Sequence, residues 1–416
     1  MLYNYVLTAW KVFLRRKFFT FINLFGISLT LAVLMIATSM VEGYLYPKGP
    51  EKTSANYKVI DRLTLTNEKH TSTYGGRLGF KFIKENIWRL TSPELISLNS
   101  GASSVALYQN NQKMPKSFRR TDANYWKILD FKFIEGRAFD HGEVEQGQFV
   151  AVINQKLATE LFGQSSAIGK SLDFNNQRFQ IIGVTENVSE IERNATADIW
   201  TPYTTMPSTS YQQDYQGSWE VIVYHSDPSM LDEIQKEYIN MLKNDLVLDH
   251  QDGMSVAYSG AFNKFENIAY QTFSDEYSYQ SGTKTLATVL IVLVVVFMLL
   301  PSINMINLNV SRIMERSSEI GVRKAFGASA SQLVAQFIVE SILITLVGGL
   351  IGILISVFLL NLIEQSGLIA FAEFGMNLRV LFIGFVLILV FGFISGAYPA
   401  LKMSRLNPVS ALKGGE

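Results

Sequence analysis

The chain has 416 residues, of which 48% are hydrophobic and only 17% are charged, and its formal net charge is zero. A soluble chain usually carries about 25% charged residues, and a nucleic-acid-binding chain gathers basic residues against the phosphates, so this composition argues against both classes. The sequence contains no cysteine, which excludes disulfides, thiolate metal sites and a thiol nucleophile.

Four apolar stretches without a charged residue occur in the chain, at residues 18–41, 285–311, 341–363 and 380–401. About 20 apolar residues in a helix cross the hydrocarbon core of a bilayer, so each stretch is long enough to be a transmembrane helix. One such stretch could be a buried core helix of a soluble protein, but four favour a membrane protein. The first is longer than the apolar region of a cleaved signal peptide, and we interpret it as an uncleaved anchor.

The charges beside these helices predict their orientation, because cytoplasmic flanks are rich in Lys and Arg. Basic residues prevail in residues 1–17, 309–339 and 402–416, whereas residues 364–379 hold Glu364, Glu373 and Arg379. We therefore expect both termini in the cytoplasm and a large domain outside. The expected order is an amphipathic N-terminal segment (1–17), a transmembrane helix (18–42), an outer domain (43–284), a transmembrane helix (285–308), a cytoplasmic loop (309–339), a transmembrane helix (340–363), a short external loop (364–379), a transmembrane helix (380–401) and a cytoplasmic tail (402–416).

The outer domain has the pattern of a mixed α+β fold. Apolar residues with strand periodicity predict strands at residues 58–66, 149–153, 178–184 and 219–225. Asn154 is a suitable N-cap for a helix that ends near Gly163. Asp227 followed by Pro228 predicts the start of a second, longer helix, whose apolar residues recur at helical spacing and would pack on a sheet.

No motif in the outer domain predicts catalysis. The run from Gly163 to Ser171 resembles a phosphate-binding loop, but five residues separate its glycines where that motif has four, and it follows a predicted helix. We interpret it as a turn between a helix and a strand. The histidines lack metal-ligand spacing and no serine lies in a G-x-S-x-G turn, so we expect neither a metal site nor an enzyme; the histidines are His70, His141, His225 and His250.

The cytoplasmic loop has the pattern of two helices separated by a sharp break. Apolar residues recur among charges between residues 309 and 326, which predicts an amphipathic helix, and Gly327 can end it in a left-handed cap. Ser329 and Gln332 then form a capping box for the next helix. Such an element can dock into a groove of another protein. The alternative is a charged surface helix that only anchors the loop.

Small residues are spaced one turn apart in the last two apolar stretches. Gly348 with Gly352, and Gly392 with Gly396, would let helix backbones approach closely; the alternative is that glycine is simply common in membrane helices. None of the four stretches carries the charges that a proton-coupled pump would use. The energy for any transport therefore has to come from elsewhere.

The sequence resembles the FtsX/MacB-type ABC transporter permeases. The most specific match is the loop sequence Arg316-x-x-Glu319-Ile320-Gly321-Val322-Arg323-Lys324-Ala325-x-Gly327-Ala328-Ser329, and Tyr398-Pro399-Ala400 with Ser404-Arg405-x-x-Pro408 resembles the same family's C-terminus. In the outer domain, Glu135-Gly136-Arg137, Leu161-Phe162-Gly163 and Ile182-Gly183-Val184 are similar to the MacB-like periplasmic core domain.

The resemblance implies a non-catalytic permease subunit in the cell inner membrane, with no cofactor of its own. ATP and Mg²⁺ would bind to a separate ABC ATPase chain, and two permease chains would pair as a homodimer or heterodimer. The cytoplasmic loop would be the coupling helix that contacts the ATPase. The residues expected to do so are Arg312, Glu315, Arg316, Glu319, Ile320, Gly321, Arg323, Lys324, Phe326 and Gly327.

The resemblance also implies that ATP-driven movement passes through the first two membrane helices to the outer domain. That domain would have a porter-like part at about residues 43–125 and 208–284, and an inserted subdomain at about 126–207. We expect export of peptide, drug-like or lipoprotein substrates, with a periplasmic adaptor and an outer-membrane channel as further partners and no nucleic acid. The alternatives are a non-transporting regulator of cell-wall hydrolases or a signalling sensor, and a structural or adhesion protein.

Overall fold

The structure is a computed structural model, and it describes residues 14, 17–109, 112–248, 253–315, 322, 329–371, 374 and 378–404. The chain divides into two compact units. We call residues 1–42, 288–368 and 374–416 the helical unit, and residues 43–287 with 369–373 the sheet domain. The sheet domain corresponds to the predicted outer domain, and each unit is described by itself.

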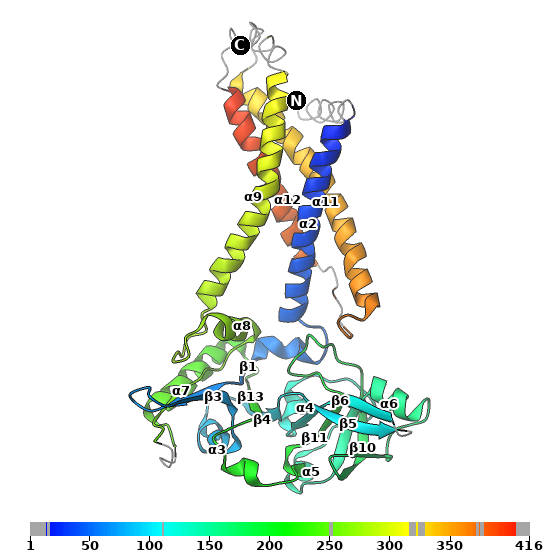
Figure 1. Cartoon of the computed structure of the whole chain (residues 1–416), viewed down its shortest axis with the longest axis vertical. Coiled ribbons are helices and arrows are strands. Elements are labelled where there is room, and N and C mark those ends of the chain that lie inside the picture. Colours follow the sequence, from blue (N-terminus) through cyan, green and yellow to red (C-terminus); the bar gives the residue numbers. More distant parts are fainter. Residues whose placement is uncertain are drawn as a thin grey trace. The chain divides into compact units, whose positions relative to one another are not determined.

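Four long helices form the described part of the helical unit (Figure 1): α2 (Lys17–Leu45), α9 (Thr283–Glu315), α11 (Ala330–Ser366) and α12 (Leu378–Ser404). Two described segments, Thr20–Leu45 and Val334–Ser366, are long and apolar enough to cross a membrane, whereas Thr283–Leu299 and Arg379–Val390 are shorter apolar helices. The described helices therefore support two of the four predicted spans by length and composition, and the other two stay predictions.

The helices of this unit share one buried apolar cluster. It takes Ile27, Leu31 and Leu34 from α2 and one residue from each of the other helices, Met298, Ile344 and Ile388. Helix α9 continues past residue 308 to Glu315, so it extends seven residues into the segment that we expected to be the cytoplasmic loop. The predicted capping box at the start of α11 is confirmed, because the Ser329 hydroxyl accepts a hydrogen bond from the Gln332 amide at 3.3 Å.

The sheet domain is built on one 14-stranded mixed sheet with the main order β14-β2-β3-β13-β4-β6-β11-β8-β10-β7. The strands are β1 (Tyr57–Ile60), β2 (Leu63–Thr66), β3 (Thr73–Leu78), β4 (Leu95–Ser100), β5 (Ser103–Gln109), β6 (Gln112–Thr121), β7 (Phe133–Gly136), β8 (Val150–Asn154), β9 (Ser171–Phe174), β10 (Gln177–Thr185), β11 (Ile199–Pro202), β12 (Gln216–Gly217), β13 (Trp219–Tyr224) and β14 (Val256–Tyr258).

Short helices connect and cover these strands (Figure 1). The α-helices are α3 (Phe80–Glu85), α4 (Asn124–Ile128), α5 (His141–Glu145), α6 (Gln155–Phe162), α7 (Leu231–Asn244) and α8 (Lys264–Phe273). The 3₁₀ helices are η1 (Pro50–Asn56), η2 (Ile87–Arg89), η3 (Tyr203–Thr205), η4 (Ser210–Gln213) and η5 (Pro228–Met230).

Most of the strand and helix predictions in this domain are confirmed. Strands β8, β10 and β13 lie where the apolar runs predicted them, and α6 begins at its predicted cap, where Asn154 Oδ1 accepts a hydrogen bond from the Leu157 amide at 2.8 Å. Gly163 follows this helix with a φ of 63°, a conformation that favours glycine. The segment from Gly163 to β9 is the predicted turn between a helix and a strand. Asp227 begins η5, which leads directly into α7.

The prediction of one strand over residues 58–66 is wrong. The chain leaves the strand conformation at Asp61 and Arg62, which separate β1 from β2. The two strands have different partners, because β1 pairs with β13 whereas β2 pairs with β3 and β14. The alternation of apolar and polar residues continues across β1 and β2, so the sequence pattern does not indicate that the two strands pair with different partners.

The sheet domain has three buried apolar clusters. One takes residues between 60 and 98 and between 219 and 261, one takes residues between 105 and 199, and the third includes Tyr57, Trp200 and Ile222. The fully buried Trp200 stabilises the fold by roughly 1.5–3 kcal/mol on the scale of large apolar side chains.

Candidate functional site

The sheet domain contains a cleft of about 800 Å³ whose walls are rich in charged side chains. The walls come from the segment after α2, from β1–β3, from loop 189–195 and from α8 with the residues that follow it. The charged residues that line it are Glu51, Asp61, Arg62, Arg77, Arg119, Glu190, Arg193, Glu220, Lys264, Asp275 and Glu276.

A buried ion pair lies at one wall of the cleft. The carboxylate of Glu51 is fully buried, and the Lys264 ammonium lies 2.5 Å from its Oε2. The Tyr57 hydroxyl donates to the same oxygen at 3.1 Å. The backbone amides of Asn194 and Ala195 donate to Oε1 at 2.6 and 3.0 Å. A buried carboxylate is tolerated only when it is paired and hydrogen-bonded, and Glu51 meets both conditions.

Lys264 connects two distant segments of the chain. Its side chain is only 7% exposed, and its ammonium also donates to the carbonyl of Tyr44 at 3.1 Å. Tyr44 lies in the last turn of α2, whereas Lys264 is the first residue of α8, the helix before α9. A capping box between Asn263 and Glu266 fixes the start of α8 and therefore the position of Lys264. The ion pair thus joins the chain leaving α2 to the chain entering α9.

Loop 189–195 closes the same wall. The carboxylate of Glu192 is buried and accepts a hydrogen bond from the Glu51 amide at 2.8 Å. Burial, and then the charge of Glu51, raise the pKa of Glu192. Burial raises the pKa of Tyr57 well above its usual value, so its hydroxyl keeps the proton that it donates to Glu51.

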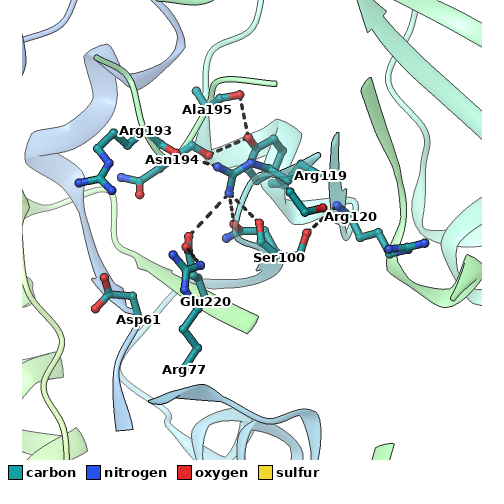
Figure 2. Close-up of polar contacts among 12 residues, drawn as sticks. Asp61, Arg77, Ser100, Arg119, Arg120, Arg193, Asn194, Ala195 and Glu220 are labelled. Carbon is teal, nitrogen blue, oxygen red and sulfur yellow. Dashed lines mark hydrogen bonds and ion pairs between the residues drawn. The ribbon is translucent and has the colours of Figure 1, made fainter. Parts of the chain in front are cut away.

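A second buried charge ties loop 189–195 to the central strands (Figure 2). The guanidinium of Arg119, on β6, is 1% exposed and donates to the Asn99 Oδ1 at 2.6 Å and to the Ser100 carbonyl at 2.8 Å. It also donates to the Arg193 carbonyl at 2.7 Å. Glu220, on β13, lies 3.6 Å from Arg119 and pairs with Arg77. Movement of this loop therefore has to disturb the middle of the sheet.

The connection between α11 and α12 reaches the same loop. The amide of Glu190 donates to the carbonyl of Ala370 at 3.1 Å. The Lys156 ammonium lies 5.8 Å from the centre of the Phe371 ring, within the range of a cation–π contact. Loop 189–195 is therefore contacted by Glu51, in the segment that follows α2, and by Ala370, between α11 and α12.

Asp61 lies at the break between β1 and β2 and lines the cleft. Its Oδ2 accepts hydrogen bonds from the side-chain amides of Asn267 at 3.1 Å and Gln271 at 3.3 Å. Burial raises the pKa of Asp61. The hydrogen bond from Asn267 and the charges of Arg77 and Arg62 lower this pKa, and the donors to Asp61 among the described residues are neutral side-chain amides.

The buried charges around the cleft hold distant segments of the chain together, so a movement of one segment would be passed to the others. Among the described residues, no group of three or more His, Cys, Asp or Glu side chains could hold a metal ion. The buried charges bind each other and the backbone, and their partners come from segments far apart in the sequence. Buried hydrogen-bonded charges resist rearrangement, because removing one partner leaves an uncompensated charge.

The structure describes two of the ten predicted ATPase-coupling residues. Arg312 and Glu315 lie near the end of α9. The other eight, Arg316, Glu319, Ile320, Gly321, Arg323, Lys324, Phe326 and Gly327, lie outside the described residues.

The glycines chosen for helix packing lie in the helical unit. A Cβ atom on Gly348 would lie 2.8 Å from the Ile27 side chain, and one on Gly352 would lie 2.8 Å from the Ser28 carbonyl. A Cβ on Gly392 would lie 3.3 Å from the Cα of Ile342 and from Thr345. Gly396 lies in the same helix, α12. These positions bring α11 close to α2 and to α12.

Sequence reasoning missed the residues of the buried network. Glu220 carried a usable signal, because it is a charged residue in an otherwise apolar strand, and charged residues are almost never buried unless paired. Arg119 lies in a strand with many polar residues, which gave no such signal. Glu51 and Lys264 carried no local signal of that kind.

Comparisons with known proteins agree with this architecture. The family model described as the MacB-like periplasmic core domain matches residues 20–240, and the one described as the FtsX-like permease C-terminal matches residues 291–408. The macrolide export ATP-binding/permease protein MacB of Pasteurella multocida is 28% identical over 69% of this chain and 41% of its own length. The MacB protein of Bdellovibrio bacteriovorus is 30% identical over 67% of this chain and 41% of its own length.

A third relative is the uncharacterized ABC transporter permease YknZ of Bacillus subtilis. It is 27% identical over 70% of this chain and 68% of its own length. The matches therefore span about two fifths of the length of these two MacB proteins and about two thirds of YknZ.

Proposed function

Because this chain belongs to the family of ABC transporter permeases that combine a MacB-like periplasmic core domain with an FtsX-like C-terminal domain, we propose that it couples ATP hydrolysis by a partner ATPase to movement of its sheet domain. In this proposal the ATPase is a separate chain, and the permease itself catalyses no reaction. ATP and Mg²⁺ bind to the ATPase.

The observation that supports this proposal is the buried tie between Glu51, Lys264 and the Tyr44 carbonyl. It joins the chain leaving α2 to the chain entering α9 inside the sheet domain. A relative displacement of these two segments has to separate an ion pair that is shielded from water, which is unfavourable by several kcal/mol. The sheet domain therefore moves with the two helices and does not absorb their displacement locally.

The proposal assigns each part of the chain a place. Four transmembrane helices anchor it in the cell inner membrane, with both termini in the cytoplasm and the sheet domain on the other side. Residues 312–327 contact the ATPase, and two permease chains pair as a homodimer or a heterodimer. The cargo is exported and is a peptide, a drug-like molecule or a lipoprotein, with a periplasmic adaptor and an outer-membrane channel as possible further partners.

Co-purification with the ATPase tests the coupling assignment. Glu319→Lys and Arg323→Glu reverse charges in the proposed contact, and each should lower ATPase recovery and its stimulated activity by about tenfold, since one lost charged contact is worth about 1.5–3 kcal/mol. Lys236→Glu, a reversal at a side chain that is 69% exposed on α7, is the matched control. If the ATPase remained bound and active in both loop variants, the assignment would be wrong.

A further inference from the structure

Helix α8 turns polar side chains toward the rest of the sheet domain. The side-chain amides of Asn267 and Gln271 donate to Oδ2 of Asp61 at 3.1 and 3.3 Å. The carboxylate of Glu266 lies 3.4 Å from the ammonium of Lys58, whose side chain is only 4% exposed. Polar contacts therefore hold one side of α8 against the domain.

Apolar side chains remain on the outer side of the same helix. Ala269 and Tyr270 are its buried apolar residues. Ile268 and Phe273, by contrast, are 38% and 37% exposed, and Phe265, which is partly exposed, lies one turn before Ile268 on the same side. A helix on the surface of a soluble domain usually turns its apolar side inward and its polar side to water. The outer side of α8 is therefore suited to an apolar environment.

The start of α8 lies beside the end of the first apolar helix. The Lys264 ammonium donates to the carbonyl of Tyr44 at 3.1 Å. Tyr44 lies less than one helical turn beyond Val41, the last residue of the charge-free stretch. The hydrocarbon core is about 30 Å thick and each headgroup layer adds roughly 5–8 Å, so Tyr44 reaches the headgroup layer. Tyr46, which is 55% exposed, follows at once, and tyrosine is enriched at that level.

The last turns of α8 contact the residue that precedes α9. A Cβ atom on Gly282 would lie 3.2 Å from the Cβ of Phe273 and 3.3 Å from the carbonyl of Ala269. Helix α9 begins at the next residue, Thr283. Both ends of α8 therefore lie against residues that adjoin a helix assigned to the membrane, which places α8 at the level where those helices leave the bilayer.

The charges on α8 indicate which lipids suit it. Its one basic residue is Lys264, which is 7% exposed and paired with Glu51. Asp275 and Glu276 follow the helix and are exposed. No accessible cation on α8 attracts anionic headgroups, so the attraction has to come from burial of apolar surface. Lipids without net charge fit this surface.

We propose that α8 is an interfacial helix, which inserts Phe265, Ile268 and Phe273 among neutral lipids of the leaflet on the side of the sheet domain. The inference rests on the membrane placement of α2 and α9 in the proposed function, but it requires neither ATP nor the ATPase. Because Lys264 is the first residue of α8, the lipid contact also holds its ammonium beside Glu51.

Fluorescence quenching by labelled lipids tests this contact. The chain has no cysteine, so Ile268→Cys, Thr272→Cys and Phe273→Cys each place one NBD fluorophore on the full chain in phosphatidylcholine nanodiscs. The lipids carry a nitroxide either near the headgroup or near the bilayer centre. All three positions should be quenched, and about threefold more by the shallow nitroxide, because an interfacial helix lies at the boundary between headgroups and acyl chains.

Three control positions calibrate the measurement. Leu29→Cys, at a side chain that is 50% exposed in the first apolar stretch, should be quenched more by the deep nitroxide. Lys236→Cys, 69% exposed on α7, should not be quenched by either lipid. Gln271→Cys, on the polar side of α8, should be quenched about threefold less than Thr272→Cys, because neighbouring residues of a helix point in different directions. Leu29→Cys tests the membrane placement by itself, so its failure is distinguishable from a failure at α8.

Three results would overturn the proposal when Leu29→Cys is quenched. One is that the outer positions of α8 are not quenched by lipid. Another is that they are protected from iodide in the water but not quenched by lipid, because a second permease chain would then cover them. The third is equal quenching at Gln271→Cys and Thr272→Cys. Thermal unfolding in the same nanodiscs identifies any variant that is not folded, and Thr272→Cys, at an exposed side chain that donates only to the Ile268 carbonyl of its own helix, then decides the test.

Discussion

Removal of the Lys264 ammonium is the sharpest test of the buried ion pair between Lys264 and Glu51. In Lys264→Met the Glu51 carboxylate stays fully buried and keeps its three hydrogen bonds, but it loses its counter-ion. Breaking a buried pair by removing one partner lowers the free energy of unfolding by about 3–5 kcal/mol. For a domain of roughly 250 residues each kcal/mol shifts the unfolding temperature by about 2–4 °C, so the expected decrease is about 6–20 °C.

Tryptophan fluorescence of the full chain in nanodiscs measures this shift. Four of the five tryptophans lie in the sheet domain, at positions 88, 126, 200 and 219, so the signal reports mainly on its unfolding. Glu51→Gln combined with Lys264→Met removes both charges and should be less destabilising than Lys264→Met alone. The reasoning is refuted if Lys264→Met shifts the transition no more than Lys236→Met does at an exposed position.

Three further predictions concern other parts of the chain. Burial raises the folded-state pKa of Asp61 above its unfolded value, so its stabilising contribution is complete at acid pH and is lost as pH rises through the folded pKa; Asp61→Asn should therefore raise the unfolding temperature at pH 8 more than at pH 5. Gly352→Ala places a Cβ 2.8 Å from the Ser28 carbonyl and should destabilise the helical unit by about 1–3 kcal/mol, measured as earlier heat-induced loss of the size-exclusion peak. Ser329→Ala removes the cap of α11 and should weaken its first turn by about 1 kcal/mol, seen as roughly fivefold faster amide exchange at Gln332.

Each of these predictions has an outcome that contradicts it. An Asp61→Asn effect that is equal at both pH values would mean that the carboxylate is not desolvated. Gly26→Ala, where nothing lies within 4 Å of the added Cβ, should be tolerated, and equal losses in the two glycine variants would remove the packing argument. Unchanged exchange at Gln332 in Ser329→Ala would show that the hydroxyl does not hold the first turn.

The sequence predicted the elements whose determinants are local. The cap at Asn154, the glycine at 163 and the apolar run of β13 each specify structure within a few residues, and the structure has all three. The break at Asp61 was not predicted because it depends on which strand each half pairs with. That choice is made by residues far away in the chain.

The residues of the candidate site could not be predicted from the sequence, because they too depend on contacts between distant parts of the chain. Lys264 and Tyr44 are 220 residues apart, and no periodicity or spacing connects them. Charged residues inside apolar strands, such as Glu220, predict that a buried partner exists but do not identify it. The ATPase-coupling residues remain a prediction, which rests on a contiguous motif and needs no knowledge of the fold.

The central claim is that movement at the ATPase reaches the sheet domain through the tie between Glu51 and Lys264. Because the chain has no cysteine, Lys236→Cys places a single spin label on α7, and pulsed electron paramagnetic resonance then measures the distance between labels in a permease pair. The account predicts that ATP binding to the partner ATPase changes this distance in the otherwise unaltered chain, and that adding Glu51→Gln with Lys264→Met abolishes the change while ATP hydrolysis continues. The same nucleotide-dependent change with and without the tie, or no change in either protein, would contradict it.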